Sequence, residues 1–359
     1  MPWENSRFSQ RLELNSKIVE KVYAILAEID SVKNSWKITE RLLPQTIERL
    51  TYSVIVTSAG SSNRIEGNRL TDSEVEKLYK NLRIKKFKTR DEQEIAGYIQ
   101  CLEPIIKHYR DIPISESSIF KLHQDMLRYS EKDTRHRGQY KFGSNRVEAK
   151  DQKGNVLAIL FDPTPPHLVK KEMMELIEWY NWAMNKKIKH PLIIIANFIF
   201  EYLAIHPFQD GNGRTSRLLT NLMLLQHEYL FASIVSHERI IEANNADYYL
   251  ALNKTQNTWK TSAEDISPWL LFFLNIIRIQ SNQALKLLEN DSIEHLLSEK
   301  QLTLWHWAIK QNTSFSRKDV IAALNFPPRT VEAIIKKLVD LKRLKRLGQG
   351  KTTSYTVIT

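Results

Sequence analysis

The segment from His206 to Arg217, with the sequence HPFQDGNGRTSR, gathers side chains that can do chemistry. It contains an imidazole, a carboxylate, two glycines that flank an amide, and two arginines. The segment 191–205 before it is apolar on nearly every side and is predicted to be a buried helix, and 218–225 is predicted to be a second one. Because a polar, glycine-containing loop between two core helices is costly to fold, we expect this loop to bind a ligand.

The residue types of this loop favour an anionic ligand. Gly211 and Gly213, on either side of Asn212, allow the backbone to approach a ligand closely. Where such a loop leads into a helix, the unpaired N–H groups and the helix dipole attract anions. Arg214 and Arg217 are three residues apart and share one helix face, and guanidinium groups bind phosphate oxygens through two parallel hydrogen bonds. The segment is therefore predicted to hold a phosphate chain.

Two further residues predict the chemistry done on that phosphate chain. Asp210 is a hard oxygen ligand of the kind that Mg²⁺ takes alongside substrate phosphates. His206 has an ordinary pKa near neutrality, so it can act as a general base without a large pKa shift. The alternative is a packed core histidine, a solvated pair of arginines and a simple glycine turn. The conjunction favours a nucleotide site with a base that activates an incoming hydroxyl.

The whole segment resembles the active-site motif of the Fic/Doc (Fido) family, His-x-Phe-x-Asp/Glu-Gly-Asn-Gly-Arg-x-x-Arg, and no position departs from it. The resemblance implies a Fic-type helical core that transfers AMP from ATP to a Ser, Thr or Tyr hydroxyl of a protein and releases pyrophosphate. Self-modification is expected as a side activity, and transfer of another nucleotide or phosphate-containing group is the alternative. The roles that it implies are the base for His206, a ligand of Mg²⁺ between the α- and β-phosphates for Asp210, the phosphate cradle for Gly211, Asn212 and Gly213, contacts to the β- and γ-phosphates for Arg214 and Arg217, and a core anchor for Phe208.

A second motif, from Ser62 to Gly67 (SNRIEG), resembles the Ser/Thr-x-x-x-Glu-Gly/Asn inhibitory motif that some Fic proteins carry. The resemblance implies an ion pair between Glu66 and Arg217, which would withhold this arginine from the γ-phosphate of ATP. A guanidinium suits a buried carboxylate because it offers two parallel hydrogen bonds. The alternative is ordinary capping of a helix end. A related hypothesis is that Glu66 orients water and removes AMP from a modified protein.

The residues that follow this motif predict a helix boundary. Thr71 and Glu74 have the spacing of a capping box, so a new helix should begin just after Gly67. This leaves Glu66 at a helix end, from which its side chain can project. The basic run 83–90 further on is predicted to be an exposed turn between helices.

Other parts of a Fic-like core are placed by pattern and by resemblance. The segment 146–161 is predicted to be a hairpin, which in the family is a flap that holds a target strand; a surface hairpin without a ligand is the alternative. Lys141 stands where the family commonly has Arg. Prolines open a helix predicted over 167–184. Tyr248 and Tyr249 lie in a region that lines the nucleotide in the family, although adjacent aromatics on a helix are more often core.

The last part of the chain resembles a winged helix-turn-helix. Helices are predicted over 300–309, 316–324 and 327–341, followed by a two-stranded wing over 344–358 in which 350–352 forms a turn. The third helix would enter a major groove of DNA, and the excess of Lys and Arg favours contact with phosphates. Such domains also serve as dimer or protein contacts, so a homodimer is the alternative.

Length and composition set the broader expectations. We expect a mainly α protein with an N-terminal helical region with the inhibitory motif over 1–112, a Fic core with a hairpin flap over 113–283, and the winged helix over 284–359. The 359 residues carry a net charge of +11, which favours acidic partners. The single cysteine suits a reducing cytoplasm, and neither a signal peptide nor a run long enough to span a membrane is apparent. A DNA-binding regulator whose core senses a nucleotide is the rival function.

Overall fold

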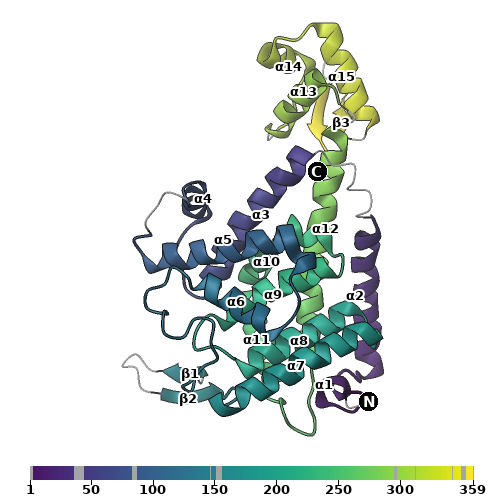
Figure 1. The fold of residues 1–359 in the computed structure, drawn as a ribbon. Helices are drawn as coiled ribbons and strands as arrows, with labels where there is room; N and C mark the ends of the chain where they lie inside the picture. The colour runs from purple at the N-terminus through teal and green to yellow at the C-terminus, as the bar shows by residue number, and fades with distance from the viewer. Residues whose placement is uncertain are drawn as a thin grey trace. The chain divides into compact units, whose positions relative to one another are not determined.

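The computed structural model describes residues 3–35, 44–82, 87–145, 147–150, 156–294, 297–311, 313–341, 343–348 and 353–358. The chain is mainly helical, as the sequence predicts, and forms two compact units, 1–285 and 286–359 (Figure 1). The three-part division drawn above stays a prediction. Among the described residues, no helix combines the length and the apolar character that crossing a membrane requires.

Helices make up most of unit 1, and a single hairpin is described beside them. The elements described there are α1 (Arg7–Gln10), α2 (Ser16–Ser35), α3 (Pro44–Ile65), α4 (Asp72–Lys80), α5 (Arg90–His108), η2 (Tyr109–Asp111), α6 (Glu116–Met126), β1 (Val147–Lys150), β2 (Val156–Phe161), α7 (Pro166–Lys186), α8 (Pro191–Ile205), α9 (Asn212–Gln226), η3 (Leu230–Ser233), α10 (His237–Ala243), α11 (Asn245–Gln256) and the start of α12 (Ser267–Glu294).

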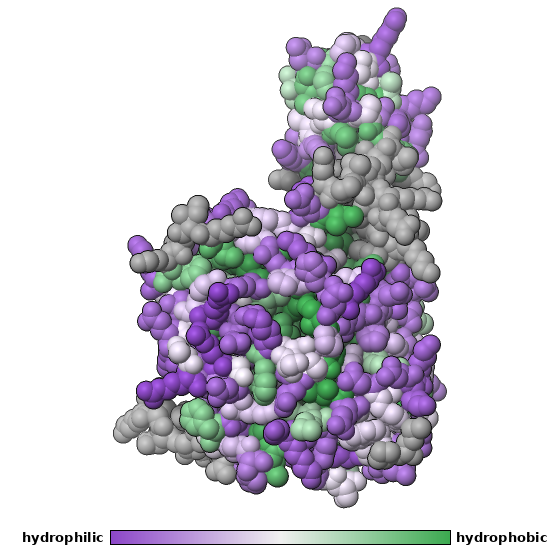
Figure 2. All heavy atoms as spheres, viewed as in Figure 1, coloured by the Kyte–Doolittle hydropathy of each residue, from purple (hydrophilic) through white to green (hydrophobic). Residues whose placement is uncertain are grey.

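Helices α8 and α9 form the centre of unit 1 and pack against each other, with α7 alongside α8 (Figure 1). Every residue of α8 from Leu192 to Ile205 is buried, which confirms the predicted core helix. The face of the molecule in Figure 2 is mostly hydrophilic, with hydrophobic side chains in a few small areas. Because α8 and α9 are both buried along most of their length, the polar loop 206–211 connects two helices that apolar packing holds in place.

Helix α9 begins six residues before the predicted apolar segment 218–225. Apolar periodicity marks the buried part of a helix, whereas the first turn of α9 is polar and includes Gly213 and Arg214. Gly211 lies at the N-cap with a φ of 82°, in the left-handed region that favours glycine. The second half of the motif is thus helical, and its side chains are fixed by the helix.

The N-terminal segment is tied to α8 by a buried charge. Glu201 is fully buried and pairs with Arg7 and with Arg11, whose Nη1 lies 2.6 Å from Glu201 Oε2. The indole N–H of Trp259 also donates to this carboxylate, at 3.1 Å. A buried carboxylate needs such partners, so Glu201 joins α1, α8 and the segment after α11.

The predicted local features of unit 1 are present where the structure describes them. Strands β1 and β2 pair as an antiparallel hairpin, and α7 covers the predicted helix 167–184. Thr71 and Glu74 form the predicted capping box at the start of α4. The hairpin turn 151–155 and residues 83–86 of the basic run lie outside the described residues.

Unit 2 contains helices and a small hairpin around its own core. Its described elements are the end of α12, α13 (Glu299–Ile309), α14 (Arg317–Leu324), α15 (Pro328–Asp340), β3 (Leu344–Leu347) and β4 (Ser354–Val357).

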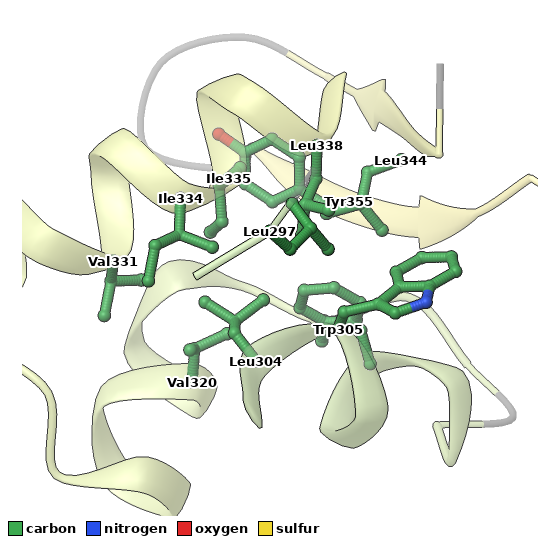
Figure 3. Close-up of a cluster of buried hydrophobic side chains, with 12 residues drawn as sticks. Leu297, Leu304, Trp305, Val320, Val331, Ile334, Ile335, Leu338, Leu344 and Tyr355 are labelled. Atoms are coloured by element: carbon green, nitrogen blue, oxygen red, sulfur yellow. The ribbon is translucent and has the colours of Figure 1, made fainter. Parts of the chain in front are cut away.

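The core of unit 2 explains why its helices form where the pattern predicts them. Val331, Ile334, Ile335 and Leu338 recur on one face of α15 and pack on buried residues of the other elements (Figure 3). Phe315 also bridges to Tyr355 of β4, through backbone hydrogen bonds of 2.9 and 2.8 Å. The predicted turn 350–352 lies outside the described residues.

Candidate active site

The loop between α8 and α9 is closed by the side chain of Asn212. Its Oδ1 accepts a hydrogen bond from the Phe208 amide at 2.8 Å, and its Nδ2 donates to the Phe208 carbonyl at 2.7 Å. Both polar atoms of this buried side chain thus contact Phe208 and hold the loop, and the backbone N–H of Asn212 is available to face an anion. That N–H lies in the first turn of α9, where helix N–H groups have no partner within the helix.

His123 of α6 contacts the same loop at Phe208 and Asp210, and this contact was not predicted from the sequence. Its ring stacks on Phe208 with the centroids 3.7 Å apart, and its Nε2 lies 2.9 Å from the Asp210 carbonyl. The Gly138 amide donates to its Nδ1 at 2.8 Å, so Nε2 carries the proton that it donates to Asp210. Burial lowers the pKa of His123 to about 4, which keeps the imidazole in this neutral form.

Lys141 and Asn145 hold the other side of the loop. The Lys141 ammonium donates to the Ile205 carbonyl at 3.2 Å and to Asn145 Oδ1 at 2.7 Å. Asn145 Nδ2 in turn donates to the carbonyl of Phe208, at 2.8 Å. Burial lowers the pKa of Lys141 to about 8. The lysine that departs from the family pattern thus caps the C-terminal end of α8 with a positive charge.

His206 lies at the end of α8 with a φ of 53°, a left-handed conformation that non-glycine residues rarely adopt. Its Nδ1 is 3.3 Å from the Leu203 carbonyl, which can only accept, so Nδ1 carries the proton and Nε2 keeps its lone pair. Burial lowers the pKa of His206 to about 4. The expectation of a nearly unshifted pKa was therefore wrong, because apolar surroundings penalise the charged imidazolium.

Asp210 follows on the same loop and is partly exposed. Its carboxylate lies 3.1 Å from Arg90 Nη2 and 3.3 Å from Arg214 Nη2, and it accepts a hydrogen bond from the Gly211 amide at 2.6 Å. Burial acts to raise the pKa of Asp210, but Arg214 and this amide outweigh it and the pKa is lowered. In the part of the chain that the structure describes, no cluster of three metal-ligating side chains is found. A metal on Asp210 would take its other ligands from a substrate or water.

Arg217 is buried and is held by the upstream motif. Its Nε donates to Ser62 Oγ at 2.8 Å, and its Nη2 donates to the Ser62 carbonyl at 2.8 Å and to Glu66 Oε1 at 2.7 Å. The ion pair that the resemblance implies is thus present. Ser62 lies on α3 and Glu66 directly follows that helix, with Gly67 next at a φ of 94°. The left-handed Gly67 turns the chain away and leaves the Glu66 side chain at the helix end.

Gly213 lies beneath the Glu66 carboxylate. A Cβ atom at this position would be 2.2 Å from Glu66 Oε1 and 3.2 Å from Arg217 Nη1, so a larger residue would fit only if the Glu66 side chain moved. The Glu66 carboxylate therefore occupies the space above the first turn of α9, where an anion would bind.

Three buried guanidinium nitrogens of the two arginines have no hydrogen-bond partner among the described residues. They are Nη1 of Arg217 and both Nε and Nη1 of Arg214, the last of which has only the ion-pair contact with Glu94. An unpartnered buried donor is costly, and a phosphate oxygen would satisfy it.

A cavity of about 380 Å³ opens beside these residues, a volume typical of small-molecule sites. Tyr248 is buried and Tyr249 is 46% exposed, and both line the cavity together with His206. The other lining residues are Glu66, Phe161, Leu203, Gly213, Leu252, Asn253 and Gln256. The structure thus brings His206, Glu66, Gly213 and both tyrosines together around one cavity, while Asp210 and Arg214 lie on the neighbouring loop and helix turn.

Several supporting residues were missed because they are far from the motif in sequence. They are Arg90, Glu94, His123 and Asn145. Arg90 contacts Asp210, and Glu94 lies 3.3 Å from Arg214 Nη1. No spacing in the sequence indicates these contacts, which form only when α5 and α6 pack beside α9.

Comparisons with known proteins identify relatives of this chain. The sequence pattern of the family described as Fic/DOC matches residues 113–224. A Fido domain-containing protein of Dictyostelium discoideum is 31% identical over 110 residues, which cover 31% of this chain and 72% of that protein. The protein adenylyltransferase Fic of Nematostella vectensis is 26% identical over 218 residues, which cover 59% of this chain and 44% of that protein. This chain thus spans less than half of the Nematostella protein.

Among solved structures, the crystal structure of a Fic family protein from Desulfovibrio desulfuricans G20 matches with a TM-score of 0.61 and 22% identity. The match covers 94% of this chain and 96% of that chain, and it shows a shared fold. The matched region 113–224 contains the whole segment from His206 to Arg217. On these grounds, this chain belongs to the Fic/DOC family.

Proposed function

We propose that this chain is a protein adenylyltransferase that transfers AMP from ATP to a hydroxyl group of a target protein. The main support is the juxtaposition of His206 with the first turn of α9, beside a cavity of nucleotide-binding size. The name of the Nematostella relative agrees with this activity.

In the proposed reaction, Nε2 of His206 accepts the proton of the target hydroxyl while the hydroxyl oxygen attacks the α-phosphorus of ATP. The P–O bond to the β-phosphate breaks, and pyrophosphate leaves. The low pKa of His206 keeps the imidazole neutral at pH 7, so that its lone pair is available. Arg214 and Arg217 would hold the β- and γ-phosphates through the donors that are now unpartnered.

We propose Mg²⁺ as the ion that accompanies ATP, with Asp210 as its protein ligand. The ion would neutralise charge on the α- and β-phosphates. The lowered pKa of Asp210 keeps its carboxylate ionised, which suits this role. The Asp210 carboxylate forms ion pairs with Arg90 and Arg214 in this structure. These ion pairs would have to break or rearrange before the carboxylate could bind the ion.

We also propose that the resting protein is inhibited by its own Glu66. The carboxylate takes Nη2 of Arg217 and lies above Gly213, and both contacts belong to the proposed phosphate site. The negative charge of the Glu66 carboxylate would repel the γ-phosphate of ATP. The carboxylate would also occupy the space that the γ-phosphate needs. ATP would then bind in a pose that is not aligned for transfer.

The experiment that tests the transfer activity uses two labelled forms of ATP. With Mg²⁺ and a cell lysate, the Glu66→Gly variant should label itself or other proteins from α-labelled ATP and not from γ-labelled ATP. His206→Ala in the same background should remove this labelling. Label transferred from the γ-position, or labelling that survives His206→Ala, would contradict AMP transfer at this site.

For unit 2, we propose a winged helix-turn-helix that binds DNA. Arg329 and Lys336 are both exposed on α15 and lie seven residues apart on one face, and Lys345 and Arg346 are exposed on β3. This gives the proposed recognition helix and wing four basic side chains that can contact phosphates.

The test is the salt dependence of binding to duplex DNA by the full chain. Replacing Arg329 and Lys336 by Ala should weaken binding and reduce the slope of log K against log salt by about 1 for each phosphate that the protein no longer neutralises. Lys310→Ala, at an exposed position at the end of α13, is the matched control. Equal affinities for both variants, or a dimer that forms without DNA, would favour a protein contact instead.

A further inference from the structure

The end of α3 that carries the inhibitory motif is docked on α10 by a second set of contacts, separate from those to Arg217. The first of these is buried. Glu238 of α10 has no exposed surface, and its carboxylate accepts hydrogen bonds from Ser58 Oγ of α3 at 2.8 Å and from Tyr98 of α5 at 2.9 Å. Asn221 of α9 also donates to it, at 2.7 Å. One carboxylate therefore joins α3 to three helices of the catalytic core.

The second contact is an ion pair at the rim of the same interface. Nε and Nη2 of Arg64 donate to the two carboxylate oxygens of Glu242 at 2.6 and 3.0 Å, in the two-pronged geometry that fixes both side chains. Nη2 also donates to Asp72 at 2.9 Å, and Nη1 donates to the Leu70 carbonyl at 3.0 Å. Arg64 thereby connects α3, the segment after Glu66, and α10.

Gly60 makes room for this arginine. It lies in the interior of α3, where glycine costs about 0.5–1 kcal/mol relative to alanine. A Cβ atom there would be 2.7 Å from Nη1 of Arg64 and 3.0 Å from Asp72. The glycine lets the guanidinium fold back along the helix and reach its partners.

The spacing along α3 links these contacts to the inhibitory glutamate. Ser58, Ser62 and Glu66 follow each other at intervals of four and so lie on one helix face. Ser58 is fixed by Glu238, and Ser62 and Glu66 are fixed on Arg217. Arg64 lies between these last two in sequence, so its contact sets how the final turn of α3 is placed on the core.

We propose that Arg64 and Glu242 are positioning residues that hold Glu66 on Arg217, so that breaking their ion pair relieves the inhibition from outside the catalytic site. The proposal rests on the inhibitory role of Glu66. The Arg64 side chain is 21% exposed and that of Glu242 30%, whereas Glu238 is sealed in the core. The rim pair is therefore the part of the docking surface that can open without unfolding the core.

The test is a set of single and double variants in the full chain. Arg64→Gln and Glu242→Gln should each raise self-labelling from α-labelled ATP about fivefold, the scale of a coupling through one ion pair. Neither should change the rate further when Glu66→Gly is already present, because the glutamate that they position is gone. Arg278→Gln, which removes an interhelical ion pair between α12 and α2, is the control and should leave the rate unchanged.

Gly60→Ala provides a second route that removes no polar group. Its methyl group would displace the Arg64 guanidinium, while alanine favours the helix, so the rate should rise and the melting temperature should not fall.

The outcomes separate the two proposals. If Glu66→Gly activates the protein and the Arg64, Glu242 and Gly60 variants do not, the positioning role is wrong and the inhibition stands. It is also wrong if these variants raise the rate equally in the Glu66→Gly background. If Glu66→Gly itself brings no activation, the inhibitory role fails first.

Discussion

Glu66 Oε1 lies 2.7 Å from Nη2 of Arg217, and a Cβ atom on Gly213 would be 2.2 Å from the same oxygen. A single carboxylate thus lies against both Arg217 and Gly213, two residues of the proposed phosphate site. The Glu66 carboxylate also places a negative charge near the first turn of α9, where the helix dipole is positive.

Replacing Glu66 by Gly should therefore free both contacts. We expect the rate of AMP transfer to rise by one to several orders of magnitude, the scale of an arginine contact to a transferring phosphate. Initial rates of labelling from α-labelled ATP measure this, with Glu76→Gly on the exposed side of α4 as the control. Equal rates in parent and Glu66→Gly would remove the inhibitory assignment.

Replacing Asn212 by Ala should damage the loop. The change leaves the buried amide of Phe208 without its partner, which costs about 1–3 kcal/mol, and leaves the Phe208 carbonyl with Asn145 alone. We expect a lower melting temperature and at least a tenfold loss of transfer in the Glu66→Gly background, because His206 and Asp210 share this loop. Asn257→Ala, at an exposed helix end, should change neither measurement. Full activity of Asn212→Ala would show that the loop keeps its shape without the amide.

His123 should matter for turnover although it lies outside the motif. His123→Ala removes the ring that stacks on Phe208 and the N–H that holds the Asp210 carbonyl, so Asp210 loses its fixed position. We expect kcat to fall about tenfold or more, with a smaller change in the KM for ATP, since the cavity that holds the base is untouched. The exposed His108→Ala on α5 is the matched control. A change confined to KM would argue against a role in positioning.

The stability of the fold should depend on acid through Glu201. Burial would raise the pKa of this carboxyl, but Arg11 and Arg7 outweigh it and lower the pKa to about 2 from an ordinary value of 4.5. A lowered pKa gives stability that is complete above the ordinary value and is lost as the pH falls toward about 2. At pH 7 the free energy of unfolding of the parent should exceed that of Glu201→Gln by about 3 kcal/mol. This difference should disappear as the pH falls from about 5 to 2. Denaturant unfolding at several pH values measures this, and a gap that does not vary with pH would contradict it.

The sequence by itself predicted the family, which the comparisons show, and named residues that the structure brings together around one cavity. The segment from His206 to Arg217 carries every specified position of the Fic motif, and the apolar runs beside it predicted the helices that hold it. These inferences succeed because they depend on local pattern: helix periodicity, capping residues and glycines at turns are all read within a few residues. The helices of unit 2 were predicted for the same reason.

The tertiary structure decided how the residues of the motif are held and in which ionisation state. The Asn212 side chain forms hydrogen bonds with the backbone of Phe208. Burial of His206 in the folded protein lowers the pKa of its imidazole. Contacts between distant segments, such as His123 with Asp210 and Arg64 with Glu242, leave no trace in residue spacing. They arise from the packing of whole helices, and desolvation and ion pairing depend on that packing and not on neighbours in the chain.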